Sequence, residues 1–237
     1  MMLKRWEDLP EQLRNEAVRP YYGMLKKKQL SLFFKRLFDL AVSAVMLVLL
    51  SPVLLILAIC IKVDSPGPVF YRQERITQYA RTFRIFKFRT MVVNADKIGA
   101  LVTTKSDSRI TRMGEKIRRF RLDELPQLIN VFLGDMTFVG TRPEVKKYVD
   151  AYTPEMQATL LLPAGVTSEA SIRYKDEDAL LEGAEDVDAV YIQKVLPGKM
   201  TYNLRAIREF SFWKDIATMF RTVFAVLGKE YGADLPE

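Results

Sequence analysis

One stretch of the chain, residues 40–61, carries no charged side chain over 22 consecutive positions. Fourteen of these residues are Leu, Ile or Val, and a helix of this length rises about 33 Å, enough to cross a hydrocarbon core of about 30 Å. Core helices of soluble proteins are shorter and less apolar, and no small-residue cleavage site follows the run, which argues against a signal peptide. We therefore expect this stretch to lie in a membrane.

Ser51 and Pro52 lie in the middle of this run. A proline inside a helix removes one backbone hydrogen bond, so the helix bends or breaks there, and the Ser51 hydroxyl can serve the freed backbone. Six Lys or Arg precede the run within residues 19–38, and four follow it within 62–81. Because such residues gather on the cytoplasmic side, a re-entrant helix-break-helix with both flanks on that side is favoured over a kinked span, which stays the alternative.

The residue types restrict the chemistry. The 237 residues include no histidine and one cysteine, Cys60. This excludes disulfides within the chain, His-ligated zinc and nucleophiles activated by histidine. Acid–base or nucleophilic chemistry therefore falls to carboxylates, Lys, Tyr, Ser or Thr.

The net charge of +7 is unevenly distributed. Residues 62–125 contain 15 Lys or Arg against seven Asp or Glu, whereas residues 150–190 contain two against ten. The basic block indicates a surface for phosphates of a lipid, a nucleotide or a nucleic acid. Nucleic acid is the weakest of these, because no helix-turn-helix, zinc-finger or RNP pattern occurs and the block adjoins the membrane run. The acidic block 176–188 is interpreted as a solvated helix or loop.

The expected fold is α+β and predominantly helical. Residues 69–76 and 82–90 alternate as strands do and predict a small β-hairpin with 77–81 as its turn. Residues 203–227 carry apolar side chains at near-helical spacing, as core or as an amphipathic interfacial helix. We expect three parts: an amino-terminal interfacial leader (1–34), the re-entrant membrane helix (35–62) and a cytoplasmic catalytic domain (63–237).

The leader contains a predicted short polar helix from about Pro10 to Arg19, followed by two tyrosines and three lysines. Such residues are typical of the headgroup region of a membrane. A solvated, partly disordered terminus is an equally good interpretation.

The densest chemistry lies in residues 108–144. A basic amphipathic segment with six Lys or Arg leads to Asp123 and Glu124, which stand directly before Leu125-Pro126 and an apolar helix. Proline favours the first turn of a helix, so the carboxylates should lie at the amino-terminal end of that helix, where anions bind. Two carboxylates among cations can hold a divalent metal and attack or deprotonate a phosphorylated compound. The alternative is that Asp123 only caps the helix and Glu124 only interacts with its dipole.

These residues carry a resemblance to a known family. The matching segments follow one another in order over about residues 35–228: KRLFD (35–39), Ser51-Pro52, GPVFYRQER (67–75), KFRTM (87–91), DSRITRMGEKIRR (107–119), LDELPQLINVFLGDMTFVG (122–140), Arg142-Pro143 and SFWKDIATMFRT (211–222). The chain resembles the bacterial sugar transferases, which are monotopic polyprenol-phosphate phosphoglycosyl transferases. It looks like the small, minimal form, without the additional amino-terminal membrane domain of larger members.

The resemblance implies a magnesium-dependent reaction at the cytoplasmic face of the bacterial inner membrane. A UDP-sugar gives its sugar 1-phosphate to undecaprenyl phosphate, UMP is released, and an aspartyl-phosphosugar forms as a covalent intermediate. Such a reaction is the first membrane step of a glycan pathway, whether capsule, O-antigen, exopolysaccharide or glycoprotein. The implied partners are the donor, the lipid acceptor and membrane lipid, with no nucleic acid, and a homo-oligomer is compatible with the family.

The family's motifs assign roles to positions of this chain. By resemblance Asp123 is the nucleophile, Glu124 helps to hold Mg²⁺ beside it, and Ser51-Pro52 is the break in the membrane helix. Arg118, Arg89 and the Arg142-Pro143 pair are implied to bind the donor's diphosphate and nucleotide, where a guanidinium fork suits phosphate oxygens.

Three segments depart from the family pattern: TQYAR at 77–81, Thr141 in place of a proline, and residues 163–174. We carry no site residue over to 163–174. Two other functions compete with the phosphoglycosyl transferase: a glycosyltransferase that releases UDP, and a non-catalytic membrane scaffold. The sequence identifies neither the sugar nor the pathway.

Overall fold

The computed structural model describes residues 2–95, 107–174, 180–181, 184 and 186–226. Most of the acidic block 176–188 lies outside these residues. The described helices and strands are α1 (Arg19–Lys26), α2 (Gln29–Asp64), β1 (Phe70–Tyr71), β2 (Glu74–Ile76), β3 (Thr82–Arg84), β4 (Lys87–Phe88), α3 (Arg112–Arg119), α4 (Gln127–Leu133), β5 (Met136–Val139), α5 (Lys146–Val149), β6 (Ala164–Thr167), α6 (Glu169–Arg173), α8 (Val187–Val190), α9 (Leu196–Arg208) and α10 (Phe212–Val226). Helices dominate and the strands are short, which confirms the α+β, mostly helical class.

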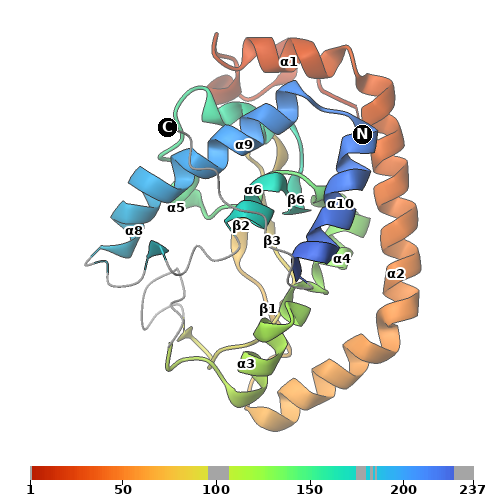
Figure 1. Ribbon diagram of the computed structural model, residues 1–237, viewed down its shortest axis with the longest axis vertical. Coiled ribbons are helices and arrows are strands. Elements are labelled where there is room, and N and C mark those ends of the chain that lie inside the picture. Colours follow the sequence, from red (N-terminus) through yellow and green to blue (C-terminus); the bar gives the residue numbers. More distant parts are fainter. Residues whose placement is uncertain (1, 96–106, 175–179, 182–183, 185, 227–237) are drawn as a thin grey trace.

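The uncharged run forms the centre of α2, which stays helical over 36 residues and contains Pro52. Figure 1 shows that α2 runs along one side of the molecule and then bends. Pro52 has no N–H to donate to the carbonyl four residues before it, that of Val48. The Ser51 hydroxyl donates to that carbonyl instead, at 2.8 Å. The helix therefore bends without breaking, because the Ser51 hydroxyl replaces the hydrogen bond to the Val48 carbonyl that Pro52 cannot make.

The first half of α2 is tied to the body by charged side chains. Lys35 and Asp39 are buried, and Arg36 is partly buried. Lys35 Nζ donates to the Val139 carbonyl at 2.9 Å and pairs with Asp215 of α10 at 2.6 Å. Asp39 accepts from the Thr137 hydroxyl at 2.6 Å. These bonds hold the membrane helix against β5 and α10.

The second half of α2 contacts the opposite part of the same body. Ile61 is buried in one cluster with Phe88 of β4 and Ile117 of α3. Near the end of α2, the Asp64 carboxylate accepts from the backbone N–H of Met113 at 3.1 Å. Both halves of the bent helix thus pack on one globular body.

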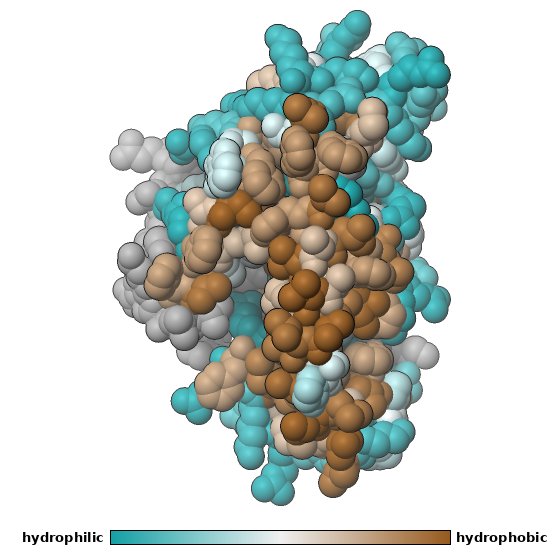
Figure 2. All heavy atoms as spheres, turned by 90° about the vertical axis from the view of Figure 1, so that its right-hand side faces the viewer, coloured by the Kyte–Doolittle hydropathy of each residue, from teal (hydrophilic) through white to brown (hydrophobic). Residues whose placement is uncertain are grey.

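The outer face of α2 is apolar and exposed. Its apolar segment is long and hydrophobic enough to cross a membrane, and only 6% of the most apolar window is buried. Figure 2 shows apolar side chains gathered over this side of the molecule. The exposed apolar residues of α2 and α10 include Val48, Leu49, Leu55, Ile56, Trp213, Phe220 and Phe224. Among the described helices, α2 is the one that could span a bilayer by length and composition.

The predicted hairpin is present, in two parts. β2 pairs antiparallel with β3, with Arg75 opposite Phe83, and β1 pairs antiparallel with β4. The turn between β2 and β3 contains Tyr79 and Ala80 with left-handed backbone angles. A parallel pair, β5 with β6, was not predicted from the sequence.

The amino-terminal segment packs into the largest apolar core. Leu13, Val18 and Leu25 are buried there together with side chains of α9. The predicted helix from about Pro10 to Arg19 is wrong in position: that stretch holds a 3-10 turn at Glu11–Leu13, and the helix lies at Arg19–Lys26. Tyr21 is buried in the core rather than placed at the surface.

Candidate active site

The two adjacent carboxylates lie on a 3-10 turn, Leu122–Glu124, immediately before α4. Arg121 precedes the turn with a φ of 54°, a left-handed conformation that few residues other than glycine adopt. Pro126 is the N-cap of α4, and no side chain caps that helix. The alternative in which Asp123 serves as a helix cap is therefore not what the structure shows.

Glu124 is held by two cations. Its Oε1 accepts from Lys87 Nζ at 3.1 Å and from Arg142 at 2.5 Å, and its Oε2 accepts from Arg142 at 3.3 Å. Burial opposes the ionisation of Glu124, but the positive charges of Arg142 and Lys87 outweigh it and hold the pKa of Glu124 well below its usual value. Glu124 is thus an ionised, fixed carboxylate.

Asp123 is in the opposite situation. Within the residues that the structure describes, its carboxylate forms no hydrogen bond or ion pair. Burial raises the pKa of Asp123, the charge of Glu124 adds to the rise, and Lys87 and Arg118 offset only part of it. Neighbouring carboxylates with pKa values pushed in opposite directions are typical of active sites, because each can then take a different role.

Lys87 is a site residue that the sequence reasoning missed. It lies on β4, its side chain is largely buried, and burial lowers its pKa, with Glu124 partly compensating. Within the KFRTM motif the family resemblance implies Arg89, two residues later, as the substrate-binding cation. Because β4 ends at Phe88, the alternation of side chains does not continue to Arg89 and the two cations point to different places.

Arg89 lies with the loop that follows α2. Its guanidinium donates to the Ser65 carbonyl at 2.7 Å, to the Ser65 hydroxyl at 2.9 Å and to the Pro66 carbonyl at 2.5 Å. Arg89 is buried. The structure therefore does not bring Arg89 into contact with Asp123 or Glu124, and its contact with a substrate stays a prediction.

Arg118 and Arg142 approach the carboxylates from two sides. Arg142 follows β5 and pairs with Glu124, while Arg118 lies in the last turn of α3, partly exposed, and its charge acts on Asp123. Pro143 faces inward with its carbonyl, which accepts from Arg75 at 3.1 Å. The site is consequently a positively charged surface around one unpaired carboxylate, and it can bind a phosphorylated anion beside that carboxylate.

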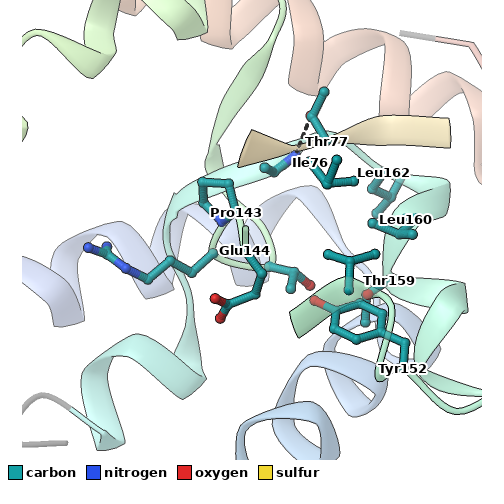
Figure 3. Close-up of a pocket in the computed structure, with 12 residues that line it drawn as sticks. Ile76, Thr77, Pro143, Glu144, Tyr152, Thr159, Leu160 and Leu162 are labelled. Carbon is teal, nitrogen blue, oxygen red and sulfur yellow. Dashed lines mark hydrogen bonds between the residues drawn. The ribbon is translucent and has the colours of Figure 1, made fainter. Parts of the chain in front are cut away.

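A small cavity lies behind Arg142-Pro143. Its volume is about 10 Å³, room for about one water molecule. Figure 3 shows Glu144, Thr159 and Tyr152 around it, and the hydrogen bond in which the Ala164 N–H donates to the Thr77 hydroxyl at 3.1 Å. This cavity is too small for a substrate. It lies among the residues that pack behind the Arg142 loop.

The chain matches a family model described as "Bacterial sugar transferase" over residues 30–229. It is similar to the UDP-N-acetylgalactosamine-undecaprenyl-phosphate N-acetylgalactosaminephosphotransferase of Aeromonas hydrophila, with 34% identity over 208 residues, which are 86% of this chain and 46% of the relative. It is also similar to the UDP-glucose:undecaprenyl-phosphate glucose-1-phosphate transferase of Klebsiella pneumoniae, with 36% identity over 82% of this chain and 40% of the relative. The enzyme of the same name from Caulobacter vibrioides is 34% identical over 81% of this chain and 69% of the relative. The chain spans less than half the length of the Aeromonas and Klebsiella relatives.

Proposed function

The chain belongs to the bacterial sugar transferase family, and on that premise we propose that it transfers a sugar 1-phosphate from a UDP-sugar to undecaprenyl phosphate, with release of UMP. The names of the relatives describe this kind of donor and this acceptor. The observation that carries the proposal is the pair of carboxylates in opposite environments: Glu124 is held ionised by Lys87 and Arg142, and Asp123 is unpaired beside them.

Asp123 is the nucleophile in this proposal. One of its carboxylate oxygens attacks the phosphorus that bears the sugar, a bond from Asp123 to phosphorus forms, and the bond from that phosphorus to the bridging oxygen breaks. UMP leaves with the electron pair. A phosphate oxygen of the lipid then attacks the same phosphorus, and the Asp123 carboxylate is regenerated. Phosphoryl transfer depends mainly on positioning and charge neutralisation, so a carboxylate suffices and no histidine is required.

The environment supports this division of roles. Both oxygens of Glu124 are engaged by cations, whereas those of Asp123 are free to attack. A raised pKa also makes the Asp123 carboxylate more basic, and hence a better nucleophile once it is ionised.

Cations around the carboxylates support binding of the anionic donor. We assign the diphosphate to Arg118, Arg142 and Lys87, because attack on a phosphorus flanked by anionic oxygens requires neutralisation of charge. We also propose that Pro143, next to Arg142, contacts the nucleotide of the donor. Arg89 enters the donor site only if the donor displaces its bonds to residues 65–66.

The carboxylates of the site are suitable ligands for magnesium. Mg²⁺ binds one or two carboxylates and completes its shell with substrate phosphates and water. Asp123 and Glu124 offer such carboxylates, and among the described residues no group of three or more acidic, His or Cys side chains offers a closed metal cage. We propose that Glu124, with Asp123, holds Mg²⁺, which supplies neutralisation of the diphosphate charge.

The anchor is proposed to be re-entrant, with the catalytic body at the cytoplasmic face of the inner membrane. Both halves of α2 contact the same body, through Lys35 at one end and Ile61 and Asp64 at the other. A helix that crossed the bilayer would place these ends on opposite sides. The basic flanks of α2 support the cytoplasmic side. Residues 1–34 and 63–237 would then form the part outside the hydrocarbon core.

A UMP-release assay tests the proposal. Protein in nanodiscs is mixed with Mg²⁺, undecaprenyl phosphate and a panel of UDP-sugars, and Asp123→Asn is measured in parallel. Release of UMP that requires Mg²⁺ and Asp123 supports the reaction and identifies the sugar. UDP as the nucleotide product indicates a glycosyltransferase, and no turnover with the whole panel favours a scaffold.

A further inference from the structure

The loop that carries Arg142 is held from behind by a buried ionic cluster. Thr141 and Glu144 bracket this loop, and their carbonyls accept from the N–H groups of Gly165 at 2.8 Å and Ile76 at 2.9 Å. Arg142 points to Glu124 of the site, whereas the Glu144 side chain is buried in the body. The loop therefore has one charged residue toward the carboxylates of the site and one toward the interior.

Glu144 has three partners in the interior. The Tyr191 hydroxyl donates to its Oε1 at 2.6 Å, Lys199 Nζ lies 3.7 Å from the same oxygen, and a guanidinium nitrogen of Arg75 lies 3.9 Å from Oε2. Lys199 also donates to the Tyr191 hydroxyl at 3.0 Å. Arg75 in addition donates to the Pro143 carbonyl at 3.1 Å. The two cations of the cluster, Arg75 and Lys199, thus interact with residues 143–144, which directly follow Arg142.

A π-helical segment, Tyr191–Val195, places two of these partners together. It joins α8 to α9, so Tyr191 and Lys199 lie on one continuous helix. Residues eight apart in an α-helix are about 80° apart around the axis, and residues seven apart are within about 20°. A π turn contains one extra residue. Tyr191 and Lys199, which are eight apart in sequence, therefore point in nearly the same direction, as residues seven apart do in a regular α-helix, and both face Glu144.

We propose that Tyr191 and Lys199 are positioning residues that act through Glu144 to hold Arg142 on Glu124 and on the donor's diphosphate. The proposal rests on the proposed phosphoglycosyl transfer. It assigns the π-helical segment a role in the reaction, although its side chains contact neither Asp123 nor Glu124. A buried charge that keeps its partners is fixed in place, and the loop that carries Glu144, which backbone bonds also join to Gly165 and Ile76, is fixed with it.

Tyr191→Phe tests the proposal while leaving the ring that packs on Tyr148 at 4.5 Å. Tyr202→Phe, the same change on α9 outside the cluster, is the matched control. In Tyr191→Phe we expect kcat/KM for the UDP-sugar to fall about tenfold, because a bond to a charged group is lost. The control should stay within about twofold of the wild type.

A double-mutant cycle tests whether the effect passes through Arg142. If Tyr191 acts through Arg142, adding Tyr191→Phe to Arg142→Ala should lower kcat/KM by less than about twofold further, since the positioned group is already absent. A further tenfold loss in the Arg142→Ala background would overturn the proposal.

Amide hydrogen exchange separates this inference from the reaction itself. The N–H groups of Ile76 and Gly165 donate to the loop, and we expect both to exchange faster in Tyr191→Phe at an unchanged Tm. Unchanged exchange with a lowered Tm would reduce Tyr191 to a structural role and overturn the proposal. If the wild type releases no UMP but exchange rises as expected, the phosphoglycosyl transfer fails and the positioning of the loop stands.

Discussion

At the scale of single residues, the contrast between Asp123 and Glu124 is what the chemistry needs. One carboxylate is charged, paired and fixed, and the other is unpaired with a raised pKa. Two chemically similar side chains in sequence therefore differ because of what surrounds them. Replacing each by its amide should have opposite effects on stability.

Asp123→Asn is expected to abolish turnover and to raise Tm by about 2–4 °C at pH 7, corresponding to about 1 kcal/mol. The raised pKa means that the folded protein binds the Asp123 proton more tightly than the unfolded chain does, so the ionised form destabilises the fold above that pKa. The gain in Tm should shrink as the pH falls through the raised pKa. Calorimetry at pH 7 and pH 4 measures this, and a lower Tm for the variant at pH 7 would contradict it.

Glu124→Gln is expected to lower Tm. The lowered pKa of Glu124 means that its ion pairs stabilise the folded protein above the unfolded pKa, and that this contribution is lost as the pH falls through the folded value. Leaving Lys87 and Arg142 without their anion should cost about 3 kcal/mol, roughly 6–12 °C. The same calorimetric series decides; an unchanged Tm would show that the two cations need no counter-ion.

At the scale of elements, α2 supports the site through α4. Arg36 donates to the carbonyls of Val131 and Phe132, in the last turn of α4, at 2.6 and 2.9 Å. The Val131 carbonyl also accepts from the backbone N–H of Gly134, the C-cap residue, at 3.2 Å. The dyad lies at the other end of the same short helix. A residue of α2 thus binds the carboxy-terminal end of the helix that follows Asp123.

Arg36→Met should lower kcat at least tenfold and lower Tm, because two charge-assisted bonds to α4 are lost. Lys27→Met, an exposed cation on the same basic flank, is the control and should change neither. UMP-release kinetics and thermal unfolding in nanodiscs provide the two readouts. Equal kcat in Arg36→Met and wild type would mean that α4 needs no cap from α2.

The bend in α2 also makes a prediction about topology. In a Cys60→Ser background, Leu30→Cys and Val63→Cys place one exposed thiol at each end of the helix. A membrane-impermeant maleimide should label both thiols from the cytoplasmic side of vesicles and neither from the other side. Adding Pro52→Ala should straighten the helix and reduce labelling of one of them. Labelling of the two ends from opposite sides in the unaltered helix would contradict a re-entrant anchor.

At the scale of the whole molecule, the sequence predicted the features that depend on local pattern. These are the long apolar helix with its proline, the hydrogen bond from the Ser51 hydroxyl to a backbone carbonyl that the proline leaves without a donor, and the antiparallel pairing of β2 with β3. They follow from periodicity, composition and backbone chemistry within a few residues.

Long-range features could not be predicted. The choice of Lys87 over Arg89 as the partner of Glu124 depends on where β4 ends, and the burial of Tyr21 depends on α9, far away in the chain. The cluster around Glu144 requires a π turn and residues from three distant segments. Spacing in sequence carries no information on such contacts, because they arise only when separate elements pack.

The central claim is a two-step transfer through Asp123, and the most direct measurement is the burst of UMP in the absence of the lipid acceptor. Nanodisc-embedded protein is mixed with the UDP-sugar found active, and UMP is counted per mole of enzyme. We predict a burst approaching one UMP per enzyme, absent in Asp123→Asn, with one sugar phosphate added to the intact mass of the wild type. UMP release that requires the lipid from the first turnover, with no change in mass, would contradict the covalent mechanism.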